Sequence, residues 1–308
     1  MKMTGRQEEH NQGNSHSMQL KLMNTSLYIS ISNTELVSWK KHITSWFQYI
    51  EKAFSRFLTH NELWLFNQAP VNELIQISPV FYDILQKAEE YRKKTEGRFS
   101  PFLLNELEAH GYNQSFPFKE ATTNNAKIES HFDSKPLEFH EGFQIIKRTD
   151  QKIDLGGIAK GYAVEAAAKW LRTNAKSRYG IVDGGGDMTV WSNGEKTWDI
   201  GIMNPYHEDQ RIGSFQIQNG GVATSNTIYR SWLQGGTKKH HLLDGRTGNP
   251  VKTSIIQATV VMNHCLDAEI GAKVCFMNDG KPIKSILNKL EEKNNFLIVN
   301  SDENIEMG

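Results

Sequence analysis

The stretch "IDLGGIAKGYAVEAAAKWL", residues 153–171, decides how the centre of the chain folds. It passes from a β-branched start through Gly156 and Gly157 into a segment whose apolar residues recur at helical spacing. Glycines before a helix let backbone N–H groups approach an anion, which the helix N-terminus also favours. The glycines alone would fit a simple tight turn, but Asp154 and Lys160 add opposite charges beside it. The stretch therefore predicts a strand-to-helix turn with a charge pair beside a backbone-rich pocket, although its spacing matches neither a P-loop nor the dinucleotide fingerprint.

Composition limits the classes of partner. The 308 residues carry 35 Lys and Arg against 35 Asp and Glu, so the formal net charge is zero. A neutral balance argues against nucleic acid or an anionic membrane surface as the main partner. No apolar run approaches the roughly 18 residues of a membrane span. The chain is long enough for one large or two medium domains, and a small-molecule site is expected.

The N-terminal segment and the cysteines bear on location. Residues 1–18 are polar and lack the apolar region of a secretory signal, so we expect a disordered leader. Cys265 and Cys275 form no C-x-x-C pair, which fits reduced thiols in one helical region better than a disulfide. Together these features predict a cytoplasmic protein.

Hydrophobic periodicity predicts an α+β fold, because helices and strands are interspersed without the strict alternation of a doubly wound sheet. A strand or hairpin arm is expected over 19–32, then a helix capped at Asn33 or Thr34 that includes Val37 and ends near Phe54. Further helices are expected from Ser78 to Gly97, after Gly161, after Leu266 and over 281–292, with short strands from about residue 140 and a hairpin over 295–307.

The segment "HHLLDGRTGNP" contains a candidate base. His240 and His241 are adjacent and precede two leucines, so in a strand the two imidazoles should face opposite sides and one can point into a cleft. A neutral imidazole near physiological pH can take a proton from a hydroxyl nucleophile. The commoner alternative for any single histidine is a hydrogen-bonded surface residue.

Two acidic segments leave alternatives open. "VDGGGDM" places three glycines before Asp187, which indicates either close approach of a ligand or a bulge. Asp267 lies near an expected helix start, where it is either a favourable N-terminal charge or an oxygen ligand for Mg²⁺.

Taken in order, these segments resemble the FAD:protein FMN transferase family, also called the ApbE family. The resemblance covers almost everything after the leader. The segment at 154–171 resembles its Asp-Leu-Gly-Gly-x-x-Lys-Gly-Tyr-Ala motif, and "VDGGGDM" its Asn-x-Gly-Gly-Asp strand. The remaining similar segments are "WDIGIMNP", "GGVATSNTIYRSW", "HLLDGRTGNPV" and "LDAEIGA", the last similar to Ala-Asp-Ala-x-x-Thr-Ala.

The resemblance implies a single ApbE-like domain over 19–308, with mixed or antiparallel sheets, flanking helices, and a cleft between lobes of about 19–140 and 141–308. It implies Mg²⁺-dependent transfer of FMN from FAD to a Ser or Thr hydroxyl of a partner flavoprotein, with AMP released. His241 would be the base, and Asp267 and the Gly157 carbonyl would hold the metal. FAD would contact Met23, Arg98, Phe99, Ser100, Asp154, Lys160 and Leu243.

The sequence departs from the family pattern at several of these positions. Ser100 stands for Asp, Asn226 for Gly, Gly245 for Pro, and Gly271 for the Thr that would complete the metal site. Two alternatives follow: an FAD-binding protein without transfer activity, and an FAD hydrolase that gives FMN and AMP. Neither the acceptor protein nor the oligomeric state can be read from the residues.

Overall fold

A central antiparallel sheet organises the chain. The computed structural model describes residues 15–121 and 135–308. Its eight-stranded sheet has the order β1-β2-β7-β8-β11-β14-β15-β16, and every neighbouring pair is antiparallel. The strands are β1 (Ser15–Leu22), β2 (Thr25–Ser32), β7 (Gly180–Asp183), β8 (Asp187–Trp191), β11 (Gly220–Asn226), β14 (Ile255–Met262), β15 (Asn295–Asn300) and β16 (Ile305–Met307).

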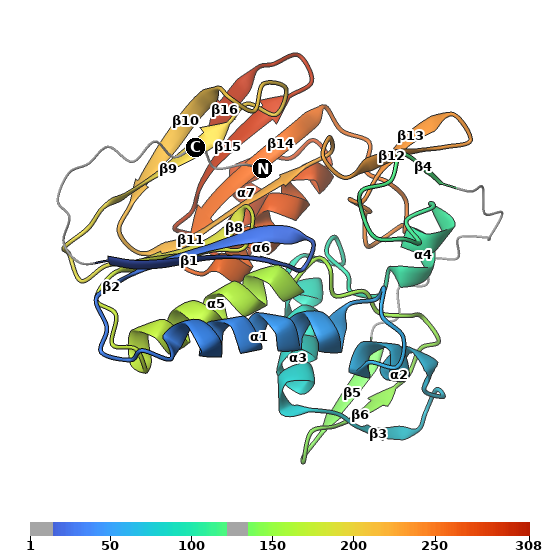
Figure 1. Cartoon of the computed structure of the whole chain (residues 1–308). Helices are drawn as coiled ribbons and strands as arrows, with labels where there is room; N and C mark the ends of the chain where they lie inside the picture. The colour runs from blue at the N-terminus through green and yellow to red at the C-terminus, as the bar shows by residue number, and fades with distance from the viewer. Residues whose placement is uncertain (1–14, 122–134) are drawn as a thin grey trace.

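Helices cover one face of this sheet. In Figure 1, α1 and α5 lie side by side below the sheet, and α6 packs against β11 and β14. Buried apolar residues of α1, α3, α5 and the sheet form one continuous core. The helices are α1 (Trp39–Phe54), α2 (Glu62–Gln68), α3 (Pro79–Lys94), α4 (Leu104–Ala109), α5 (Ala159–Thr173), α6 (Cys265–Val274), the 3₁₀ turn η1 (Cys275–Met277) and α7 (Ile283–Leu287).

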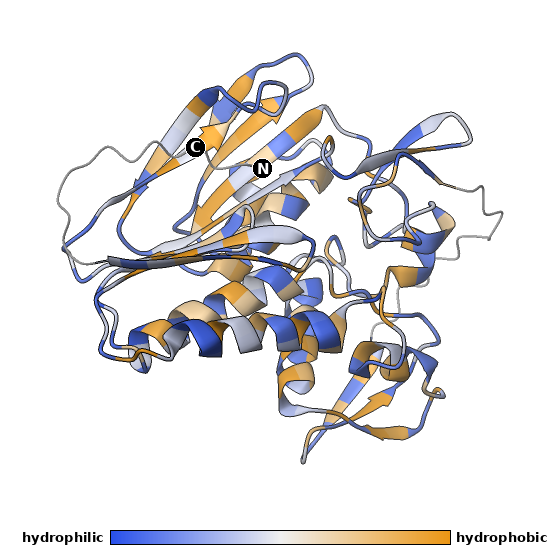
Figure 2. Ribbon diagram, in the orientation of Figure 1, coloured by the Kyte–Doolittle hydropathy of each residue, from blue (hydrophilic) through white to orange (hydrophobic). Residues whose placement is uncertain are grey.

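Smaller sheets complete the fold. The ribbon of β9 (Trp198–Met203) and β10 (Arg211–Ile217) covers part of the other face, where Ile200 packs on Met188 and Val222. Figure 2 shows that β14 and β15 consist largely of apolar residues. The other small sheets join β4 (Glu120–Ala121), β12 (Ser231–Gln234) and β13 (Thr237–His240), and β3 (Leu74–Gln76), β5 (Leu137–His140) and β6 (Gln144–Lys147).

The structure confirms the α+β class but moves two predicted boundaries. Strand β1 begins at Ser15, so residues 15–18 belong to the sheet and not to the leader, while residues 1–14 lie outside the described residues. The sheet also joins β1 and β2 directly to β7, so it does not follow a division into lobes at residue 140. The first hairpin turns at Met23 and Asn24, whose φ angles of 54° and 55° match a two-residue type I′ turn.

The prediction for the first helix was wrong at its start. Helix α1 begins at Trp39, and Val37 is 92% exposed. The Thr34 hydroxyl donates to the Ala175 carbonyl, far along the chain, and so does not cap this helix. Helix α3 follows the prediction, because Ser78 accepts a hydrogen bond from the Phe81 N–H at its N-terminus.

Later helices differ in length from their predictions. Helix α5 already includes Lys160 and Gly161, α6 begins one residue before Leu266, and α7 covers only part of 281–292. Helix α2 was not predicted. Cys265 and Cys275 are free, buried thiols, as expected, and burial raises the pKa of both. Within residues 15–121 and 135–308, none of the helices is long and apolar enough to cross a membrane.

Candidate active site

A cavity of about 780 Å³ collects almost all the predicted site residues. This volume lies in the usual range for small-molecule and cofactor sites, roughly 300–1,000 Å³. The β1–β2 turn, the end of α1, the loop after α3, the start of α5 and the segment after β13 all contribute to its wall. The predicted residues that line it are Met23, Arg98, Phe99, Ser100, Asp154, Gly157, Lys160, His241 and Leu243. Asp267 does not line it.

The joint before α5 forms the floor of this cavity. The Asp154 carboxylate accepts the Gly156 N–H at 3.2 Å, which shapes the turn before the helix. Ala159 and Lys160, the first residues of α5, also line the cavity. The floor therefore offers the N-terminus of a 15-residue helix, where anions are favoured.

Beside this floor lies a buried cluster of charges. The Lys160 ammonium contacts Asp187 at 2.7 Å and Glu269 at 3.3 Å. Glu269 is fully buried, and its carboxylate also accepts from the Lys273 ammonium at 3.1 Å and from the Gly161 N–H at 2.9 Å. Burial alone would lower the pKa of Lys160, but the carboxylates of Asp187 and Glu269 outweigh it and raise that pKa. Lys160 is therefore a fixed cation.

The structure corrects the register assumed for α6. Asp267 accepts a hydrogen bond from the Tyr91 hydroxyl at 2.8 Å, outside the cavity. Gly271 faces apolar atoms, because a Cβ there would lie 3.2 to 3.3 Å from Leu287, Met262 and Val260. Glu269 and Lys273 are the acidic residue and its i+4 partner that face the α5 joint. The family motif predicted Asp267 and Gly271 for this face. Glu269 and Lys273 lie two residues further along, which is about 200° around the helix.

Magnesium does not fit the donor set that results. Hard cations of this kind need several oxygen ligands, usually including a carboxylate. The carboxylate of Glu269 is already shared by two ammonium groups and a backbone N–H. No group of three or more His, Cys, Asp or Glu side chains suited to a metal occurs within the described ranges. Gly157 lines the cavity but Asp267 does not, so the two residues that the resemblance gives to the metal do not both line this cavity.

His241 is the histidine that reaches the cavity. Strand β13 ends at His240, and His241 lies in the bend that follows, so the two do not simply alternate along one strand. The His241 Nδ1 lies 3.4 Å from the Arg230 carbonyl, which favours a proton on Nδ1 and leaves Nε2 free to accept one. Burial, then the charge of Arg230, holds the pKa of His241 well below its usual range. The imidazole is therefore neutral at pH 7.

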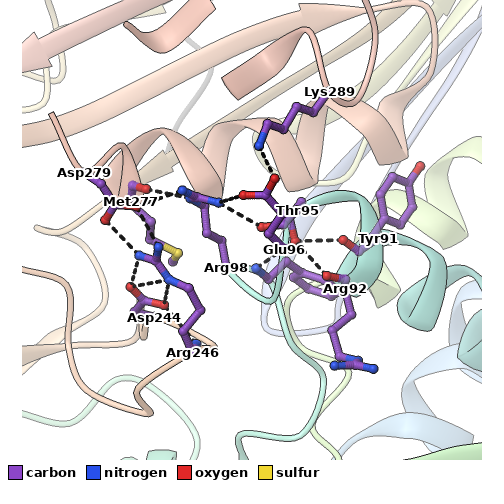
Figure 3. Close-up of polar contacts among 11 residues, drawn as sticks. Tyr91, Arg92, Thr95, Glu96, Arg98, Asp244, Arg246, Met277, Asp279 and Lys289 are labelled. Atoms are coloured by element: carbon purple, nitrogen blue, oxygen red, sulfur yellow. Dashed lines mark hydrogen bonds and ion pairs between the residues drawn. The ribbon is translucent and has the colours of Figure 1, made fainter. Parts of the chain in front are cut away.

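Arg98 is held by the protein rather than open to a ligand. Its guanidinium donates to the Met277 carbonyl at 3.0 Å and to Asp279 at 2.8 Å (Figure 3). It also contacts Glu96 at 3.0 Å, and Asp279 in turn binds Arg246 at 2.6 Å. This network ties the loop that carries Phe99 and Ser100 to η1 and the segment that follows it. Arg98 therefore positions the cavity wall.

Two departures from the family pattern have structural reasons. Asn226 accepts the N–H groups of Ile228 and Tyr229 at 3.2 and 2.9 Å, so it begins the turn after β11. Gly245 donates its N–H to the Arg98 carbonyl at 2.9 Å, a bond that proline cannot make.

Gly245→Ala is expected to disturb this wall. A Cβ at residue 245 would lie 2.3 Å from the Gly97 carbonyl oxygen, and backbone there must move to relieve the clash. We expect the free energy of unfolding to fall by about 1–3 kcal/mol, with weaker FAD binding, as measured by urea unfolding and by FAD titration. Thr247→Ala, an exposed site in the same turn, is the control. Equal stabilities of the two variants would contradict the prediction.

Asp183, at the end of β7, is expected to make the free energy of unfolding depend on pH. Burial raises the pKa of its carboxyl from 3.8 to about 6, although it accepts the N–H groups of Gly185 and Gly186. The folded carboxyl therefore holds its proton more tightly than the unfolded one, and stability decreases as pH rises from about 4 to about 6. Asp183→Asn keeps an acceptor oxygen and removes the titration. We expect it to raise the free energy of unfolding at pH 7 by about 1–3 kcal/mol.

Urea unfolding of wild type and Asp183→Asn between pH 4 and 7 checks this prediction. The two stabilities should converge at the acid end and separate as pH rises. Parallel curves would show that Asp183 is not the titrating group.

Sequence reasoning missed several residues that line or support the cavity. Arg56 lines it, pairs with Asp154 at 3.4 Å, and has a buried Nη2 without a hydrogen-bond partner in the described part of the chain. Arg230 and Lys273 also line it. The i, i+4 spacing of Glu269 and Lys273 was the available signal in the sequence.

Similarity to known structures identifies the fold. The ApbE protein of Thermotoga maritima is 24% identical, with a TM-score of 0.81 over 95% of this chain and 96% of that one. The flavinyl transferase ApbE of Pseudomonas stutzeri, in its apo form, is 14% identical, with a TM-score of 0.78 over 96% and 94%. The architecture described above is therefore an ApbE fold.

The family follows from the sequence match. The family model of ApbE matches residues 23–298, and the chain belongs to this family. A FAD:protein FMN transferase of Chlamydia pneumoniae is 27% identical over 266 residues, covering 82% of this chain and 80% of that protein. Another, from Klebsiella pneumoniae, is 34% identical over 132 residues. That match covers 42% of this chain and only 40% of the Klebsiella protein.

Proposed function

We propose that this protein transfers the FMN part of FAD to a Ser or Thr hydroxyl of a target flavoprotein and releases AMP. Membership of the ApbE family and relatives named FAD:protein FMN transferase support this reaction. The observation that carries it is that His241 lines the same cavity as the N-terminus of α5 and Lys160. The proposed base and the proposed anion site therefore line one cavity.

The chemistry follows from these groups. The acceptor oxygen attacks the phosphorus on the FMN side of the pyrophosphate, a new P–O bond forms, and the bond to AMP breaks. His241 Nε2 takes the hydroxyl proton. Lys160 and the N–H groups at the start of α5 stabilise the charge that spreads over the phosphoryl oxygens, which is the main requirement of phosphoryl transfer. No covalent intermediate on the enzyme is needed.

The rest of the cavity would hold the cofactor. Met23, Phe99 and Leu243 offer apolar surface to a flavin or adenine ring. The Nη2 of Arg56, which has no hydrogen-bond partner among the described residues, would suit a carbonyl or phosphate oxygen of a ligand. Asp154 and Ser100 lie on the same wall and are proposed as further polar contacts.

Mass spectrometry of an acceptor flavoprotein after incubation with FAD and the purified protein tests the proposal. We expect a covalent FMN adduct on a Ser or Thr and one AMP per adduct. AMP formed without acceptor would instead identify an FAD hydrolase. FAD binding with neither product, across cognate acceptors, would identify a binding protein and reject transfer.

A further inference from the structure

A lysine lies where the family motif leads one to expect a metal site. Lys273 belongs to the last turn of α6 and lines the cavity. Its ammonium donates to the Glu269 carboxylate at 3.1 Å and to the Glu269 carbonyl at 3.2 Å. The side chain is only 13% exposed. The charge is therefore held in one place at the edge of the cavity.

This lysine passes directly beside the joint before α5. A Cβ built on Gly157 would lie 3.6 Å from Lys273 Cε and 3.4 Å from the Phe99 ring. Gly157 is the residue whose carbonyl was assigned to the metal. The ammonium-bearing chain of Lys273 thus runs along the part of the floor where the pyrophosphate of FAD is proposed to bind.

The charges around this place favour an anion without help from a metal. Lys160 and Lys273 contact the carboxylates of Asp187 and Glu269, and a third cation, Arg230, lines the same cavity and acts electrostatically on Lys160. One positive charge is left in excess. A divalent cation at Glu269 would have to displace an ammonium group from that carboxylate and would meet the repulsion of the others.

We propose that the Lys273 ammonium supplies, at the pyrophosphate site, the positive charge that a divalent cation would otherwise supply. FAD binding and transfer by this chain are then independent of Mg²⁺. The inference rests on the proposed function, because it requires FAD to occupy this cavity. An ammonium group acts on phosphate as a point charge with several donors, which suits neutralisation of a pyrophosphate.

FAD titration of metal-stripped protein tests the inference, with EDTA in one series and MgCl₂ in the other. We expect the two dissociation constants to agree within about twofold, whereas Lys273→Met should weaken FAD binding by about tenfold or more. Riboflavin, which has no phosphate, should bind wild type and Lys273→Met alike. Lys273→Arg should keep most of the FAD affinity, because it keeps the charge.

Lys169→Met, which removes an exposed lysine of α5, is the matched control and should leave FAD binding unchanged. Mg²⁺ tightening FAD binding by about tenfold would overturn the inference. Equal losses for FAD and riboflavin in Lys273→Met would also overturn it, since they would indicate packing and not charge. A wild-type protein that binds no FAD under either condition would reject the proposed function itself.

Discussion

Replacing His241 by alanine is expected to lower the rate of FMN transfer about 10²–10⁴-fold, the usual contribution of a positioned general base. FAD affinity should change by no more than about twofold, because the base acts on the acceptor hydroxyl and not on the cofactor. Single-turnover transfer followed by mass spectrometry, with a separate FAD titration, separates the two effects. A loss in both measurements would indicate that His241 shapes the cavity and does not serve as base.

His240→Ala is the matched control. His240 is the neighbouring histidine, yet it does not line the cavity, so its loss should leave transfer nearly unchanged. Burial and the nearby Arg230 hold the pKa of His241 well below 6.5. Protonation should therefore abolish transfer only below that pH, and the rate should stay level from pH 6.5 to neutral. An acid limb above about pH 7 would contradict the assignment.

The parts of the site that could be predicted from the sequence are those with local signals. The joint at residues 153–171 combines glycines, a helical pattern and a lysine. The turn and the helix start depend only on residues that are close in the sequence, so both could be predicted. Ser78 and Pro79 marked the start of α3 in the same local way. His241 needed one more step, because only the fold decides which of two adjacent histidines faces the cavity.

Which face of α6 meets the cavity floor could not be predicted from the sequence, for a physical reason. This helix is buried on nearly all sides, including Glu269 and Gly271, so its hydrophobic pattern has no polar face to orient it. Asp267 and Glu269 are both acidic and two residues apart. Only tertiary contacts, with Tyr91 for one and with Lys160 for the other, decide which carboxylate reaches the cavity floor.

Replacing Glu269 by alanine is expected to lower the free energy of unfolding by about 3–5 kcal/mol, because it leaves buried cations without their shared partner. Lys160 would retain Asp187, but among the described residues Lys273 would keep only the backbone carbonyl of residue 269. Urea unfolding gives the loss. The surface pair of Glu90 and Lys94 provides the matched control, since Glu90→Ala breaks an exposed ion pair of 2.7 Å in α3 and should cost less than about 1 kcal/mol.

The double variant Glu269→Gln with Lys273→Met tests whether charge is the cause. It removes one negative and one positive charge together, so it should be more stable than the sum of the single variants predicts by at least about 1 kcal/mol. The loss in Glu269→Ala should also persist in high salt, because ions screen buried pairs much less than exposed ones. Additive single effects, or a loss that vanishes in salt, would mean that Glu269 contributes volume and not charge, and that Lys273 is not held in place by its carboxylate.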